Sequence, residues 1–136
     1  MNHTFDLEML MGRGRMMSGG MGGVFGINGQ LFDMDRTDLT VKAGSLEYWR
    51  VRNVNRGMSM RHPFHIHATQ FQIISVNGKE PPSLLRGWHD TINLEPGDNV
   101  VLAVPFSDKL SGLYMYHCHI LEHEDAGMMG QFKVID

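Results

Sequence analysis

Short runs of alternating apolar and polar residues make up most of this chain. The first is 3–9, where polar residues separate Phe5, Leu7 and Met9. Alternation with a period of two is typical of β-strands with one buried face. Similar runs, rich in β-branched and aromatic residues, occupy 39–54, 64–76, 90–106, 112–119 and 130–136. We predict two strands around Ala43-Gly44, two around the turn at 95–98, and alternating strand structure through 64–76.

Glycine, proline, asparagine and aspartate separate these runs, and none of them has the period of a long amphipathic helix. Many short strands joined by turns predict an all-β fold, an antiparallel Greek-key β-sandwich. A short helical turn is expected at 120–125, directly after the strand that ends near His119. The segment 9–23 is rich in methionine and glycine without an apolar period, so we predict a loop there.

Length, hydrophobic content and net charge limit the classes of protein to which this chain could belong. The chain has 136 residues, 42% of them hydrophobic, which fits a single domain over 1–136 with a substantial core. Its net charge of −3 argues against a nucleic-acid partner. No apolar run approaches the roughly 20 residues that span a bilayer, and the first residues lack a signal-peptide pattern. We therefore expect no membrane contact, and the compartment is left open, periplasmic or extracellular if a longer parent chain carries a signal.

The only cysteine stands between two histidines, in the sequence His117-Cys118-His119. On a strand, both imidazoles point to one face and the thiol points to the other. In the same way His65 and His67 share a face, with Ile66 opposite. His62 precedes Pro63 and is expected outside this alternation, free to point elsewhere.

These directions define two sets of possible metal ligands. One set combines the thiol with two imidazoles and a thioether: His62, Cys118, His123 and Met128. Those groups are the ligands of a blue-copper electron-transfer site, in which a weak axial thioether tunes the potential. A zinc site at Cys118, or a buried cysteine with no metal, is the alternative.

The other set contains four imidazoles: His65, His67, His117 and His119. Imidazoles alone suit a copper ion that reacts with oxygen. Cys118 is bonded through the backbone to both neighbouring histidines, so the two sets have a short covalent connection. His3 and His89 have no partner at metal-ligand spacing, and we interpret them as structural.

The motifs His-Pro-Phe-His-Ile-His (62–67) and His-Cys-His-x-x-x-His-x-x-x-x-Met (117–128) resemble those of multicopper oxidases, the family of laccases and cuprous oxidases. The resemblance is to their C-terminal cupredoxin domain, extends to 27–34 and 87–92, and covers nearly the whole chain. It implies a cupredoxin sandwich with type 1 copper at His62, Cys118, His123 and Met128. It implies a type 2 ligand at His65 and type 3 ligands at His67, His117 and His119.

The resemblance also implies an activity, in which a phenol or metal ion is oxidised one electron at a time and O₂ is reduced to water. Glu124 has two readings, a proton relay toward the oxygen site or a solvated loop carboxylate. Methionines in 9–23 likewise either bind Cu(I), as in the inserts of cuprous oxidases, or cover apolar surface.

The chain departs from the family in the number of its histidines. A trinuclear copper site in this family takes eight, four of them from two His-x-His motifs of an N-terminal domain, and no such motif remains here beyond those at 65–67 and 117–119. We therefore expect half of a type 2/type 3 site and a partner domain, in the same longer chain or another subunit, that supplies the other half. Enzyme activity is expected only of that assembly. Two copies of this chain face to face, or a self-standing copper-binding electron carrier without catalysis, are the alternatives.

Overall fold

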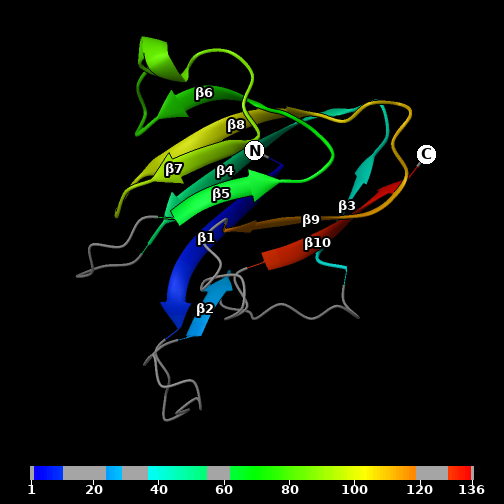
Figure 1. Cartoon of the computed structure of the whole chain (residues 1–136), viewed down its shortest axis with the longest axis horizontal. Helices are drawn as coiled ribbons and strands as arrows, with labels where there is room; N and C mark the ends of the chain where they lie inside the picture. Colours follow the sequence, from blue (N-terminus) through cyan, green and yellow to red (C-terminus); the bar gives the residue numbers. More distant parts are fainter. Residues whose placement is uncertain (1, 11–23, 29–36, 55–61, 119–128, 136) are drawn as a thin grey trace.

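The computed structural model describes residues 2–10, 24–28, 37–54, 62–118 and 129–135. In this part of the chain ten strands form two five-stranded sheets, which pack against each other as a sandwich (Figure 1). The predicted all-β sandwich is therefore confirmed. Among the described residues no helix has the length and hydropathy that a membrane crossing requires.

The first sheet has the strand order β2-β1-β4-β8-β6. Its strands are β1 (His3–Leu10), β2 (Val24–Ile27), β4 (Leu46–Asn53), β6 (Gln72–Val76) and β8 (Asn99–Pro105). Neighbours are antiparallel except for β1 and β4, which run parallel. On the outer side of this pair the guanidinium of Arg52 donates two hydrogen bonds to the carboxylate of Asp6, at 2.7 and 2.9 Å, and these raise the pKa of Arg52.

The second sheet has the order β3-β10-β9-β5-β7. Its strands are β3 (Leu39–Lys42), β5 (His62–Ile66), β7 (Thr91–Leu94), β9 (Gly112–Cys118) and β10 (Met129–Ile135). Here β3 and β10 run parallel, and the other pairs are antiparallel. Strand β5 lies between β9 and β7, so two motifs that are fifty residues apart in the sequence become neighbours.

Aromatic rings fill the space between the sheets. Trp49 is fully buried, and the ring of Phe5 lies 4.9 Å from its ring and 4.8 Å from that of Tyr116. Phe64 from β5 also packs on Phe5 and Tyr116, each at 6.0 Å between ring centroids. Tilted contacts at these separations are favourable for aromatic pairs. The core thus fixes β5 and β9 through the side chains on their inner faces.

The alternating segment 64–76 is two strands and not one. β5 ends at Ile66, and β6 begins at Gln72 in the other sheet. Between them Ala68 has a φ of 76°, a left-handed conformation that a strand cannot continue through. The pattern of side chains cannot show such a change of sheet, because β5 and the first residues of β6 both alternate between core and surface.

Other expectations meet the structure only in part. Within the described residues, strands are present in each of the predicted ranges 3–9, 39–54, 90–106, 112–119 and 130–136. β1 extends to Leu10, two residues into the predicted loop 9–23. β2 was not predicted, because its four residues are too few for a periodic signal. The helical turn expected at 120–125 lies outside the described residues, as does 11–23. The helical turn that the described residues do contain is Ser83–Leu85.

Candidate metal centre

The candidate centre lies on the outer face of the second sheet, where three strands place side chains in one row. His65 of β5 is directly opposite His117 of β9 on one side and Thr91 of β7 on the other. Paired residues of neighbouring strands present their side chains on the same face. His67 follows two residues after His65, and its N–H donates to the carbonyl of Met115 at 2.8 Å, which holds it beside β9.

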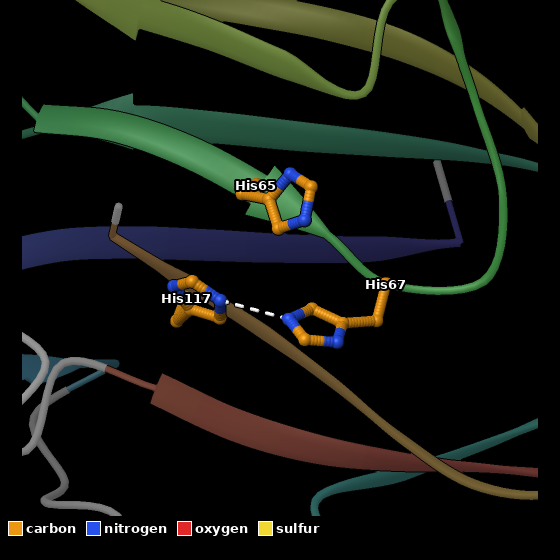
Figure 2. A group of neighbouring side chains, drawn as sticks. All are labelled: His65, His67 and His117. Atoms are coloured by element: carbon orange, nitrogen blue, oxygen red, sulfur yellow. Dashed lines mark hydrogen bonds between the residues drawn. The ribbon is translucent and has the colours of Figure 1, made fainter. Parts of the chain in front are cut away.

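Three imidazoles converge at this place. The ring centroids of His65, His67 and His117 form a nearly regular triangle, with sides of 5.0, 5.0 and 5.3 Å. One nitrogen of each ring lies within 4.8 Å of the others, and the Nε2 atoms of His67 and His117 are 2.9 Å apart. Figure 2 shows the three rings turned toward one another, His65 from β5, His67 from the loop directly after β5, and His117 from β9. The predicted grouping of these three residues on one face is therefore correct.

The contacts of His65 favour one tautomer of its neutral ring. Its Nδ1 lies 2.8 Å from the carbonyl oxygen of Asp90 and 3.0 Å from the hydroxyl oxygen of Thr91. A carbonyl oxygen can only accept, so Nδ1 carries the proton and donates it. The lone pair of the neutral ring is then on Nε2, the state in which a histidine binds a metal through that atom.

An open pocket of about 640 Å³ lies in front of His65 and His67. Trp88 and Asp90 form part of its wall, and the side chain of Trp88 is 57% exposed. His117 is only 4% exposed, so it approaches the cluster from the protein side. A ligand in the pocket could therefore reach the imidazoles of His65 and His67 from solvent.

His62 belongs to the opposite face of β5. It is fully buried, in step with Phe64 and Ile66, while His65 lies on the outer side. The prediction that His62 faces away from His65 and His67 is confirmed. The expectation that it lies outside the strand alternation is wrong, because Pro63 is accommodated within β5 and pairs with Asn93 of β7.

The rest of the thiol-containing set is described only in its backbone or not at all. Cys118 is the last residue of β9 and pairs with Phe64, two residues from His62. The segment 119–128 lies outside the described residues, and with it His119, His123, Glu124 and Met128. Their roles stay predictions.

His3 and His89 lie apart from the cluster, as predicted. His3 contacts Glu47 of the first sheet, with 3.3 Å between Nε2 and the carboxylate. His89 pairs with Phe71 through the backbone, and its Nε2 donates to the carbonyl of Leu85 at 3.1 Å. The second contact ties the helical turn to the segment directly before β7, so the contacts of His89 are structural.

The three imidazoles fit a transition-metal ion such as copper. A metal bound about 2.0–2.1 Å from two imidazole nitrogens places these nitrogens about 3 Å apart, and His67 and His117 have such a separation. Imidazole is a preferred ligand of copper. Each of the three rings offers one nitrogen as a ligand atom, so all three could contribute.

Two residues that support the centre were not predicted from the sequence, Asp90 and Thr91. They are twenty-five and twenty-six residues from His65 in the chain. No local spacing connects them to it, since they meet His65 only through the pairing of β5 with β7. The resemblance at 87–92 includes both residues, but only a prediction of that strand pairing would have assigned them a role beside His65.

Known proteins are similar to this chain in sequence and in fold. A sequence profile described as multicopper oxidase matches residues 6–136. The multicopper oxidase mco of Staphylococcus aureus is 55% identical over 109 residues, which cover 79% of this chain and 24% of that protein. A laccase of Bacillus subtilis is 35% identical, with 71% of this chain and 22% of that protein covered. The chain thus spans about a quarter of the length of these relatives.

Solved structures agree with the sequence relatives. The crystal structure of a multi-copper oxidase from Pediococcus acidilactici superposes with a TM-score of 0.80 at 41% identity, over 98% of this chain and 26% of that one. A multicopper oxidase from Campylobacter jejuni, described as a metallo-oxidase, gives 0.77 at 39% identity over 98% and 30%. The sandwich, the histidine cluster and these relatives together show that the chain belongs to the multicopper oxidase family and corresponds to its C-terminal cupredoxin domain.

Proposed function

We propose that this chain is the copper-binding, electron-transferring C-terminal domain of an oxidase that couples oxidation of a phenol or metal ion to reduction of O₂ to water. The observation that carries the proposal is the convergence of His65, His67 and His117 on one face, with His117 bonded to Cys118. Copper at these sites would supply the one-electron steps and the oxygen chemistry. The residues of the chain would position the copper ions and connect the two copper sites.

The proposal assigns type 1 copper to His62, Cys118, His123 and Met128. Its support is that the thiol-bearing residue and His62 lie on adjacent strands, two positions apart in register. From Cys118 the peptide bonds to His117 and to His119 give an electron a covalent path to the imidazole face. Glu124, next to His123, is proposed to relay protons toward the oxygen site.

The imidazole face is proposed as half of a type 2/type 3 copper site. Three of its members are side by side here, and His119 is assigned as the fourth. The open pocket in front of His65 and His67 leaves room for a second set of ligands. An N-terminal cupredoxin domain with two His-x-His motifs is the proposed partner, which agrees with the greater length of the relatives.

A copper titration with visible spectroscopy tests the type 1 assignment. We expect an intense thiolate-to-copper band with one equivalent of copper, which is lost in Cys118→Ser and kept in the control His3→Ala. A bound copper without that band, in a folded chain, would contradict the assignment.

A self-standing electron carrier is the second candidate, favoured by the small number of imidazoles on this face. Oxygen uptake with a phenolic or Cu(I) reductant separates the two, measured on the chain together with its His-x-His domain. Uptake that Cys118→Ser abolishes supports the oxidase. A type 1 band without any uptake in that assembly supports the carrier.

A further inference from the structure

The hydroxyl of Thr91 is the middle member of a directed chain of hydrogen bonds. Its Oγ1 donates to the carboxylate Oδ1 of Asp90 at 3.1 Å. Because its proton points to Asp90, its lone pairs are available to accept from the Nδ1–H of His65 at 3.0 Å. The direction from imidazole to hydroxyl to carboxylate is therefore consistent at each step.

The carbonyl of Asp90 provides a second acceptor that the sheet holds in place. It accepts from the Nδ1–H of His65 at 2.8 Å and from the backbone N–H of Ile66 at 3.2 Å. A carbonyl oxygen has two lone pairs, so both bonds can form together. The Nδ1–H of His65 is thus shared between a fixed carbonyl and the hydroxyl of a side chain that β7 places directly opposite His65.

We propose that Thr91 is a positioning residue: together with the carbonyl of Asp90 it holds His65 as the Nδ1–H tautomer, with Nε2 presented to a metal in the imidazole cluster. The inference deepens the proposed function and rests on it for the identity of the metal. Thr91 itself touches no metal. Its hydroxyl, linked to the Asp90 carboxylate, fixes the ring plane and increases the electron density at Nε2.

The tautomer can be measured without any metal. Long-range ¹H–¹⁵N NMR spectra of the metal-free chain, taken at a pH where the ring is neutral, show which nitrogen carries the proton. We expect Nδ1–H for His65. An Nε2–H tautomer would overturn the proposal, and it would leave the type 1 assignment and the oxygen uptake untouched.

Two variants of Thr91 test the part played by the hydroxyl. Thr91→Val keeps the β-branched shape and removes the acceptor, whereas Thr91→Ser keeps the hydroxyl. Measured by competition in a Cys118→Ser background, so that the thiol does not contribute, the affinity for Cu(II) should fall about tenfold in Thr91→Val, the usual size of an outer-shell effect. It should stay within about twofold in Thr91→Ser. The exchange of the His65 Nδ1–H with solvent should become faster only in Thr91→Val.

A matched control removes a threonine hydroxyl elsewhere. Thr40→Val changes an exposed side chain of β3, at the other edge of the same sheet, and should alter neither copper affinity nor Nδ1–H exchange. Equal affinities and equal exchange rates in Thr91→Val and the parent chain would overturn the role of Thr91. If Thr91→Val fails to fold, the tautomer of His65 in the parent chain still tests the proposal. That measurement needs no variant, and an Nε2–H tautomer would overturn the proposal.

Discussion

Histidines lie on both faces of β5, one in the core and one at the surface pocket. On the inner face His62 is fully buried, in step with Phe64 and Ile66. On the outer face His65, with His67 directly after the strand, meets His117 beside an open pocket. One strand of five residues therefore gives an imidazole to each of the two proposed copper sites, and the period of two is what separates them.

The two faces of β5 separate the residues that stabilise the core from the residues that could bind a metal. Inner residues contact aromatic rings of both sheets, so their loss is a loss of packing. Outer residues contact one another and the backbone of the neighbouring strand. We expect substitutions on the inner face to lower the free energy of unfolding, and those on the outer face to alter metal binding with little change in stability.

The largest effect on stability is expected on the inner face of β5. Phe64→Ala removes a fully buried ring that packs on Phe5 and Tyr116, and should lower the free energy of unfolding by about 3–5 kcal/mol. Urea unfolding followed by tryptophan fluorescence measures it. Phe64→Leu is the control, with a smaller loss. A loss below about 1 kcal/mol for Phe64→Ala would contradict the assignment of this face to the core.

An intermediate loss of stability is expected on the inner face of β10, at a position occupied by glycine. Gly130 of β10 is paired with Tyr116 of β9, and a Cβ there would overlap the tyrosine ring and its hydroxyl. Because Tyr116 is buried among other rings, Gly130→Ala should cost about 1–3 kcal/mol by overpacking. The exposed Lys133→Ala on the same strand is the control. Equal thermal stability of the two variants would show that Tyr116 moves aside freely.

The smallest effect on stability, with a large effect on binding, is expected on the outer face. His67→Ala removes one imidazole of the cluster and should change the free energy of unfolding by no more than about 0.5 kcal/mol, as for other substitutions outside the core. Cu(II) affinity in the Cys118→Ser background should fall at least about tenfold. His3→Ala should leave it unchanged. Unaltered affinity in His67→Ala would remove that residue from the centre.

The sequence by itself determined the residue types and the local directions. Alternation along a strand places His65 and His67 on one face, and this requires only the geometry of an extended chain. The short apolar runs and their turns determined most strands of the sandwich for the same local reason. The identity of the family was also readable, because the motifs at 62–67 and 117–128 are specific in spacing.

Only the tertiary structure decided which strands are neighbours. The row Thr91, His65 and His117 depends on β5 lying between β7 and β9, and the change of sheet after Ile66 depends on the turn at Ala68. Both are outcomes of how two sheets share one aromatic core, a property of residues far apart in the chain. Local patterns reflect burial, whereas strand pairing is decided by all the strands that compete for the same core. The resemblance at 87–92 includes Asp90 and Thr91, but their contact with His65 could not be predicted from the sequence.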